Sequence, residues 1–175
     1  MQLLRETCFP VSIGELASLL EAKHPPRSPV VVTFDDGYAD NLHQAMPTLE
    51  QFEIPATFFL TIGCLSQQRE FWWDELDHLL LQPGSLPETL RLTANGKSDE
   101  WCLGEAANYT AEHAEHNRRG CTWEQPPTGR HDTYYAVWKR LYALPPQNRQ
   151  SVLDEILKWA GAETVERPSH RRLSR

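Results

Sequence analysis

Two adjacent carboxylates are the residues of this chain best suited to chemistry: Asp35 and Asp36, which follow an apolar run at 30–34 and precede Gly37. A strand that ends in a tight turn can bring both carboxylates to one cleft, at the carboxyl edge where open α/β sheets and barrels place their sites. Two carboxylates this close resist ionising together unless a cation lies beside them. One could therefore bind a divalent metal while the other acts as a base. The alternative without a functional role is a solvated Asp-Gly turn that ends a strand.

The elements that must position this pair are two strands joined by a helix. The β-branched run at 30–34 is typical of a fully buried parallel strand, and a second apolar run at 56–62 has the same character. Between them we expect a turn over 39–46 and a helix from about Pro47, because proline is tolerated in the first helical turn. The order strand, helix, strand predicts a parallel βαβ unit. An earlier helix is predicted from the capping-box pair Ser12 and Glu15.

The second half of the chain has a different pattern, which predicts helices and one hairpin. An amphipathic helix is expected at 71–81, and the strands 89–93 and 98–103 flank an Asn-Gly pair that is typical of a type I′ turn. Two further helices are predicted, one capped by Asp132 and a last one that ends at Gly161. The polar stretch 104–130 has no assignable pattern. The arginine-rich end, 167–175, is expected to be a solvated tail.

Composition excludes several classes of protein. The chain has 175 residues, 40% of them hydrophobic, and a formal net charge of −7 with a pI near 5.5. That much apolar material argues against disorder, and the acidic charge argues against a nucleic-acid partner. No stretch approaches the ~20 apolar residues of a membrane span, and no secretory signal is visible. The four cysteines include no CxxC pair, so we expect free thiols and a cytoplasmic location.

The wider string around the carboxylates resembles a known family. Residues 32–38, Asn41 and residues 54–59 closely resemble the start of the polysaccharide deacetylase family, which is carbohydrate esterase family 4 or the NodB homology domain. The Phe-Trp-Trp-Asp-Glu-Leu string at 71–76 is similar to an insertion in a long-loop branch of that family. A motif backed by a second one at the expected distance is more specific than either alone.

The resemblance implies a fold and a division of the chain. The implied fold class is α/β, the start of a distorted (β/α) barrel with its first βαβ unit, followed by a mainly helical insertion with one β-hairpin. Residues 1–65 would be the N-terminal portion of the deacetylase barrel and 66–166 the insertion. Residues 167–175 would be a basic tail that approaches the next barrel strand.

The resemblance also implies a reaction. Family members hydrolyse N-acetyl, and sometimes O-acetyl, groups on glycans, so the enzyme class is a hydrolase of carbon–nitrogen bonds other than peptide bonds. By motif match, Asp35 would be the catalytic general base and Asp36 a ligand of a divalent metal, zinc in most members. The partner would be an acetylated glycan. The metal would lower the pKa of a bound water and polarise the acetyl carbonyl.

The chain departs from the family at the other metal ligands. The family's two histidines come from a His-Ser/Thr-x-x-His motif, and no such string occurs here. The pair His113 and His116 has a spacing of three and lacks the hydroxyl residue, so a solvated helix face is favoured for it. We therefore expect an incomplete N-terminal portion with little deacetylase activity. We also expect self-association, because the strand edge at 56–60 is uncharged and hydrophobic.

Two other functions stay open. One is a catalytically inactive remnant or carbohydrate-binding module that uses the tryptophans of the insertion, although most of these have helical spacing and suit a core. The other is a phosphotransfer or phosphatase-type aspartate site. The phosphatase pattern has a second aspartate two residues after the first, and here Gly37 stands two residues after Asp35.

Overall fold

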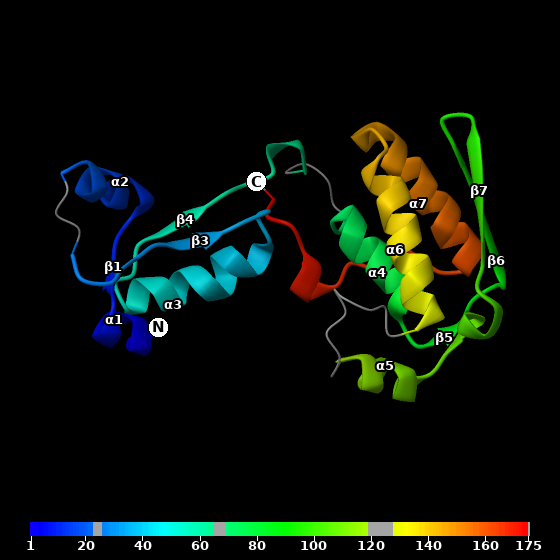
Figure 1. The fold of residues 1–175 in the computed structure, drawn as a ribbon, viewed down its shortest axis with the longest axis horizontal. Coiled ribbons are helices and arrows are strands. Elements are labelled where there is room, and N and C mark those ends of the chain that lie inside the picture. Colours follow the sequence, from blue (N-terminus) through cyan, green and yellow to red (C-terminus); the bar gives the residue numbers. More distant parts are fainter. Residues whose placement is uncertain (23–25, 65–68, 119–127, 175) are drawn as a thin grey trace. The chain divides into compact units, whose positions relative to one another are not determined.

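The computed structural model describes residues 1–22, 26–64, 69–118 and 128–174. The chain divides into two compact units (Figure 1). Unit 1 consists of Met1–Glu70 together with Glu166–Arg175, and unit 2 is Phe71–Val165. Unit 2 is therefore inserted in the sequence of unit 1. The assignment of these parts to a barrel and its insertion stays a prediction.

Unit 1 combines short helices with two pairs of short strands. Its elements are α1 (Gln2–Thr7), β1 (Phe9–Pro10), α2 (Ile13–Glu21), β2 (Pro29–Val30), β3 (Val32–Phe34), the π-helix η1 (Asn41–Ala45), α3 (Met46–Gln51), β4 (Ala56–Phe58) and the 3-10 helices η2 (Ile62–Cys64) and η4 (Pro168–His170). In Figure 1, α3 runs beside β3 and β4. The chain therefore has the α/β character expected of it.

Local signals in the sequence account for two of these helices. Ser12 caps α2: its side chain accepts from the backbone N–H of Glu15, and the Glu15 carboxylate accepts from the backbone N–H of Ser12. These hydrogen bonds also hold the pKa of Glu15 below its usual range. Pro47 lies in the first turn of α3, where its missing N–H costs no helical hydrogen bond. The predicted turn before α3 is instead largely the π-helix η1.

The two predicted strands pair in parallel, as expected for a βαβ unit. Val32, Thr33 and Phe34 of β3 lie opposite Ala56, Thr57 and Phe58 of β4. The rings of Phe34 and Phe58 stack with their centroids 5.0 Å apart.

The predicted extent and burial of these strands were wrong. The run 30–34 divides between β2, which pairs with β1, and β3, while β4 ends at Phe58 and Ile62 begins η2. None of the residues in β3 or β4 is buried, and Thr33 is exposed. A buried parallel strand needs neighbours on both edges and cover on both faces. Within unit 1, β3 and β4 pair only with each other among the described strands.

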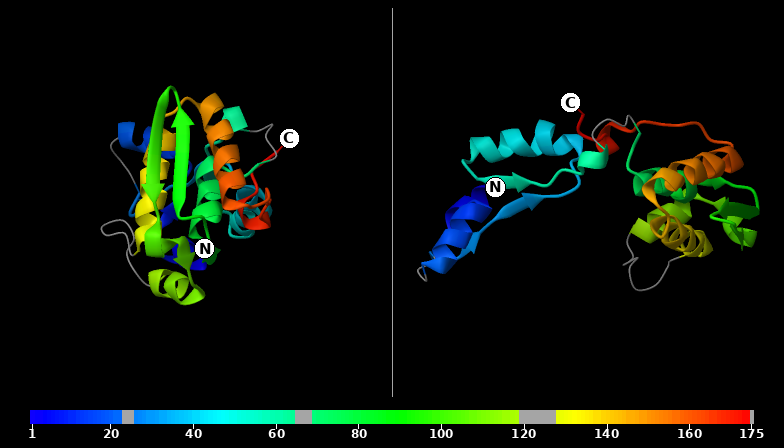
Figure 2. Two further views of the ribbon diagram at one scale, coloured as in Figure 1. Left: turned by 90° about the vertical axis from the view of Figure 1, so that its right-hand side faces the viewer. Right: turned by 90° about the horizontal axis from the view of Figure 1, so that it is seen from above.

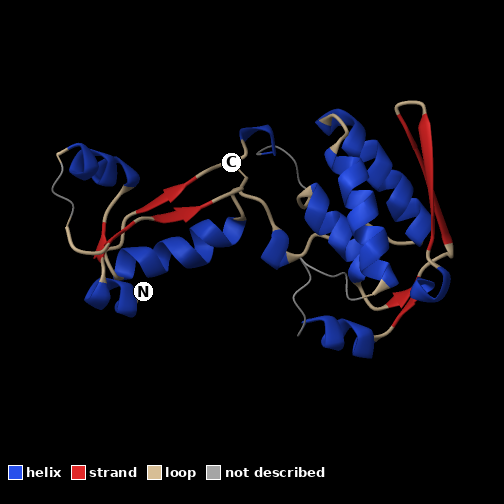
Figure 3. Ribbon diagram, viewed as in Figure 1, coloured by secondary structure: helices blue, strands red, loops and turns tan. Residues whose placement is uncertain are grey.

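Unit 2 is mainly helical with one long hairpin (Figure 3). Its elements are α4 (Trp72–Leu81), β5 (Gly84–Ser85), β6 (Thr89–Ala94), β7 (Lys97–Cys102), the 3-10 helix η3 (Gly104–Ala107), β8 (Asn108–Tyr109), α5 (Ala111–Arg118), α6 (Gly129–Tyr142) and α7 (Pro146–Ala160). The predicted hairpin is confirmed: β6 and β7 pair antiparallel, and Asn95 and Gly96 both have positive φ. The predicted cap of α6 was wrong, because Thr128 occupies the N-cap position and Asp132 lies in the first turn.

One hydrophobic core lies inside unit 2. The helices α4, α6 and α7 pack together, and the hairpin lies beside them (Figure 2). The buried residues of this core are Leu76, Leu79, Leu80, Leu90, Leu92, Leu103, Val137, Leu141, Leu144, Val152, Leu153 and Ile156. Gly161 ends α7 with φ +63°, a left-handed conformation that glycine adopts without a steric penalty. Among the helices of the described residues, none is long and apolar enough to cross a membrane.

Candidate functional site

The two candidate aspartates lie on a tight turn that directly follows β3. Asp36 has φ +66° and Gly37 has φ +84°, and the backbone N–H of Gly37 donates to the carbonyl of Asp35 at 2.8 Å. Aspartate is one of the few residues that tolerates a left-handed conformation, and glycine adopts it freely. Packing also favours glycine at position 37, because an added Cβ would lie 3.1 Å from Cδ2 of Leu60. The local sequence therefore suits the sharp turn.

Backbone hydrogen bonds brace this turn on both sides. On one side, the segment after β4 donates from Phe59 to the carbonyl of Phe34 at 2.8 Å and from Thr61 to that of Asp36 at 3.4 Å. On the other side, residues 171–173 run antiparallel to residues 37–39. The backbone N–H of Leu173 donates to the backbone carbonyl of Gly37 at 2.9 Å. The backbone N–H of Ala39 donates to the backbone carbonyl of Arg171 at 2.8 Å.

The role of residues 171–173 was missed in the sequence. The expectation of a solvated tail was wrong, because Arg172 is only 8% exposed and its backbone forms a bridge with Tyr38. The physical reason is that this segment supplies backbone partners to the turn, and a sequence pattern shows no such long-range pairing. The arginine-rich composition alone suggested exposure.

The side chains of Asp35 and Asp36 are both exposed. An exposed carboxylate at a strand end can accept a proton from water or bind a cation, and Asp35 and Asp36 have the chemistry for both predicted roles. Their individual assignment as base and metal ligand stays a prediction. A cavity of about 360 Å³ in unit 1 is lined by Leu49, Glu50, Ile54 and Phe58 among others, and its lining does not include either aspartate.

The described residues do not complete a metal site around Asp36. Among them, no group of three or more histidine, cysteine, aspartate or glutamate side chains is placed to hold a metal ion. His113 and His116 are exposed on α5, and Nδ1 of His113 accepts from the backbone N–H of Thr110 at 3.2 Å. The solvated helix face expected for this histidine pair is what the structure shows.

The other histidines are dispersed. His131 is buried in unit 2, where its Nδ1 lies 3.0 Å from the hydroxyl of Thr128, and burial lowers its pKa against the opposing effect of Asp132. His43 is exposed on η1, and His78 lies on α4. His24 lies outside the described residues.

Four tryptophans of unit 2 pack against its core. Trp72, Trp101, Trp138 and Trp159 are partly buried and pack against the hydrophobic cluster. The ring of Trp138 stacks on Tyr142, and the Nε1–H of Trp159 donates to the carbonyl of Thr89 at 2.7 Å. Trp123 lies outside the described residues. These contacts show that the described rings pack within unit 2. Packing accounts for their presence without a role in stacking on sugars.

Comparisons with known proteins find deacetylases. Residues 22–90 match the family model described as polysaccharide deacetylase. A protein from Bacillus subtilis (strain 168), a putative polysaccharide deacetylase named YxkH, is 36% identical over 62 residues, which are 34% of this chain and 22% of that protein. The chain thus spans about a fifth of the length of that curated relative.

One solved structure was also matched. The BpsB deacetylase domain from Bordetella bronchiseptica is 14% identical and has a TM-score of 0.35, covering 99% of this chain and 80% of that one. A score this low does not define a shared fold. The resemblance recognised in the sequence is confirmed by the family model and by the curated relative.

Proposed function

We propose, from the match of residues 22–90 to the polysaccharide deacetylase family model, that this chain contributes the aspartate pair of a glycan deacetylase. The observation that carries the proposal is the placement of Asp35 and Asp36 on a braced turn directly after one of two parallel strands. Such turns at strand ends are where α/β folds position catalytic groups.

In this proposal the reaction is hydrolysis of an acetyl group, N-linked or O-linked, on a glycan. The carboxylate of Asp35 takes a proton from the attacking water, which increases the nucleophilicity of that water as it adds to the acetyl carbonyl. The N-linked reaction would make the protein a hydrolase of carbon–nitrogen bonds other than peptide bonds. The acetyl carbon then loses its bond to the glycan nitrogen or oxygen, and that leaving group receives the proton. The products are acetate and a free amine from an N-acetyl group, or acetate and a free hydroxyl from an O-acetyl group.

The metal that the family implies is not accommodated by the described residues of this chain. A catalytic zinc site takes three protein ligands and leaves one position open for water. Asp36 is one carboxylate, and the described residues supply no group of three. No His-Ser/Thr-x-x-His string occurs anywhere in the sequence. We therefore propose that the other ligands come from a further polypeptide segment that is not part of this chain, and that the chain alone has little or no activity.

The test is acetate release from chitin oligomers, with zinc or cobalt added. We expect turnover close to the background rate. Robust turnover that is abolished by Asp35→Asn would contradict the incomplete ligand set and would make His113 and His116 the first residues to examine. Robust turnover that survives Asp35→Asn would contradict the role of the aspartate itself. The matched control is Asp132→Asn, which removes an exposed carboxylate in unit 2.

A binding measurement tests the glycan without requiring turnover. Amide chemical shifts are recorded while acetylated chitin oligomers or other acetylated glycans are added. We expect shifts at Asp36, Gly37 and Tyr38, and none on the hairpin of unit 2. No change at the turn with any acetylated glycan would contradict the proposal, and changes confined to unit 2 would favour the binding-module alternative.

We also propose that the exposed apolar residues of unit 1 are covered by further polypeptide, either a second copy or another part of the same protein. Phe59, Leu60 and Ile62 follow β4 and are all exposed. Uncovered apolar residues beside an open strand edge promote association. Size-exclusion chromatography should show concentration-dependent species larger than a 20.1 kDa monomer. A monomer at all concentrations would contradict self-association.

A further inference from the structure

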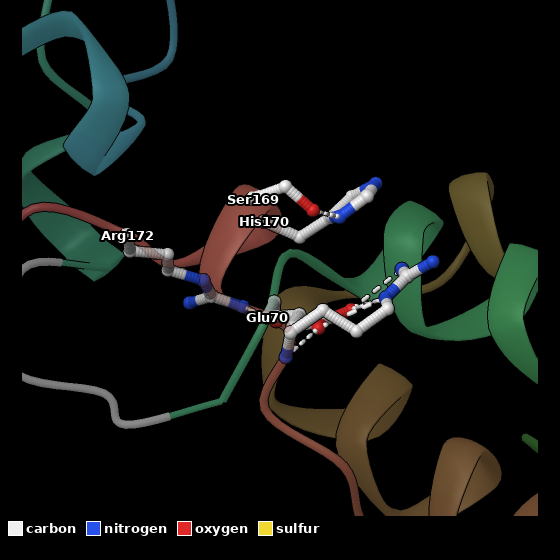
Figure 4. A network of polar contacts seen from close by, with 5 residues as sticks. Glu70, Ser169, His170 and Arg172 are labelled. Carbon is white, nitrogen blue, oxygen red and sulfur yellow. Dashed lines mark hydrogen bonds and ion pairs between the residues drawn. The ribbon is translucent and has the colours of Figure 1, made fainter. Parts of the chain in front are cut away.

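Glu70 is a buried carboxylate that joins the two sequence-distant parts of unit 1. It is 3% exposed, and two residues of the segment that follows Val165 donate hydrogen bonds to it. The backbone N–H of Arg167 donates to Oε1 at 2.6 Å, Nη2 of Arg167 donates to Oε2 at 2.7 Å, and Nε lies 3.1 Å from both oxygens. The guanidinium of Arg172 donates to the backbone carbonyl of Glu70 (Figure 4). We call Glu70, Arg167 and Arg172 the Glu70 latch.

The latch leads directly to the aspartate turn. Arg167 begins a short connection through η4 to Arg172, and residues 171–173 are the ones that pair with residues 37–39. Both ends of this connection are therefore anchored, one on Glu70 and the other on the turn. Because the connection is short, a displacement of Arg167 is transmitted to the backbone partners of Gly37 and Ala39.

We propose that Glu70 is a positioning residue for the site: by holding Arg167 and Arg172, it keeps residues 171–173 against the turn and so fixes the backbone on which Asp35 and Asp36 are carried. The importance of this for catalysis rests on the proposed function, but the mechanical link does not. Glu70 contacts Arg167 through its side chain and Arg172 through its backbone carbonyl, so it acts on the aspartates through the segment that carries these arginines.

The charges around Glu70 suit this role. Burial raises the pKa of the carboxyl, but the hydrogen bonds and charge of Arg167, together with the charge of His170, outweigh burial and hold the pKa of Glu70 below its usual range. The charged side chain of Arg172 also contacts this residue, at its backbone carbonyl. The Glu70 carboxylate is therefore fully ionised above the ordinary glutamate pKa of about 4.3, and its stabilising contact with Arg167 is complete there. This stabilisation is lost as the pH falls through the lower pKa that Glu70 has in the folded chain.

The test is amide hydrogen exchange of the whole chain, with Glu70→Gln as the variant. Glutamine keeps the size of the side chain and one acceptor oxygen but removes the charge. We expect exchange at the Ala39 and Leu173 amides to become roughly 10- to 100-fold faster, the range that corresponds to the loss of charge-assisted hydrogen bonds. The amide shifts of Asp36 and Gly37 should also move. Amides of β6 and β7 should keep their exchange rates.

Glu166→Gln is the matched control, because Glu166 pairs with Arg171 in the same segment but both side chains are exposed. We expect no change in exchange at Ala39 or Leu173 in this variant. Unchanged exchange in Glu70→Gln, or an equal acceleration in both variants, would overturn the proposal.

Hydrogen exchange of the unaltered chain is also measured as a function of pH. If Glu70 only filled space, its ionisation would not change the exchange rates at the turn. Protection factors, corrected for the intrinsic exchange rate, should fall at Ala39 and Leu173 as the pH drops through the pKa of Glu70. The step should persist in Glu166→Gln and be absent in Glu70→Gln. A flat profile in the unaltered chain would overturn the proposal. This test remains valid even if the Glu70→Gln variant does not fold. Neither measurement requires acetate release, so a failure here is distinguishable from a failure of the proposed function.

Discussion

The two units of this chain differ in where they hold their apolar residues. Unit 2 buries a continuous cluster of leucine, valine and isoleucine between three helices and a hairpin. Among the described residues of unit 1, the buried apolar ones are Val11, Ala39, Leu49 and Ile54, and neither α1 nor α2 contains a buried residue. The large exposed apolar side chains of unit 1 are Met1, Leu3, Phe9, Ile13, Leu20, Leu42, Phe59, Leu60 and Ile62, against Tyr142 and Val165 in unit 2.

The candidate chemistry and the stable core therefore lie in different units. A domain is stable when its elements bury their apolar faces against one another. Unit 2 meets this requirement by itself. Unit 1 holds the aspartate turn by backbone hydrogen bonds and by the Glu70 latch, and it leaves the apolar faces around that turn uncovered.

The largest expected effect is on independent folding. A chain of residues 71–165 should unfold cooperatively in urea, because its core is complete within those residues. A chain of residues 1–70 should not unfold cooperatively, because it has few buried apolar residues and lacks residues 166–175, which complete unit 1. All six tryptophans lie in unit 2, so their fluorescence follows that unit specifically. A cooperative transition of residues 1–70 by circular dichroism would contradict the comparison.

Arg130→Met should cause the largest loss of stability from a single substitution in unit 2. The guanidinium is 1% exposed and donates to the carbonyls of Leu80, Gly84, Ala106 and Ala107 at 2.7 to 3.2 Å. Removing this donor should lower the free energy of unfolding by about 4 kcal/mol, as for other buried hydrogen-bond networks. Tryptophan fluorescence during urea unfolding measures it.

The control for this arginine is Arg91→Gln on the exposed face of the hairpin, where Arg91 pairs with Glu100. Exposed ion pairs contribute little to stability. We expect no measurable change in the urea midpoint. Equal effects of the two substitutions would contradict the interpretation that burial makes Arg130 important.

A matched pair of leucine truncations sharpens the comparison between the units. Leu153→Ala in α7 removes a side chain with 0% exposure and should destabilise unit 2 by about 3 kcal/mol. Leu20→Ala in α2 removes one with 58% exposure and should change stability by no more than about 0.5 kcal/mol. Circular dichroism during urea unfolding reports both. A comparable loss at Leu20 would show that unit 1 has a core that the structure does not indicate.

The smallest expected effect is a local one at the aspartate turn. Gly37→Ala places a Cβ at φ +84° and 3.1 Å from a flexible leucine methyl, which should cost about 1–2 kcal/mol of local stability. Faster hydrogen exchange at Ala39 and Thr61 would measure it. Gly14→Ala in α2 is the control, because Gly14 has no atom within 4 Å of an added Cβ and alanine favours a helix by about 1 kcal/mol. An undisturbed turn in Gly37→Ala would show that this backbone is not constrained.

Most of the local structure could be predicted from neighbouring residues alone. The Ser12–Glu15 capping box, the Asn95-Gly96 turn and the glycine after α7 act over a few residues through backbone geometry and short hydrogen bonds, and each is formed as predicted. The parallel pairing of the runs before and after α3 also followed from their order along the chain. The string around Asp35 and Asp36 was sufficient to identify a resemblance to the polysaccharide deacetylase family, whose model residues 22–90 match.

Long-range contacts, in contrast, determine which elements are covered and which backbone groups brace the turn. Apolar runs at 30–34 and 56–62 look like buried strands, but burial depends on neighbours contributed by distant residues, and those neighbours are few in unit 1. The bridge between Tyr38 and Arg172 and the contact of Glu70 with Arg167 join residues about a hundred or more positions apart. No periodicity or local motif encodes such pairs. They form because folding brings unsatisfied backbone groups and opposite charges within hydrogen-bonding distance.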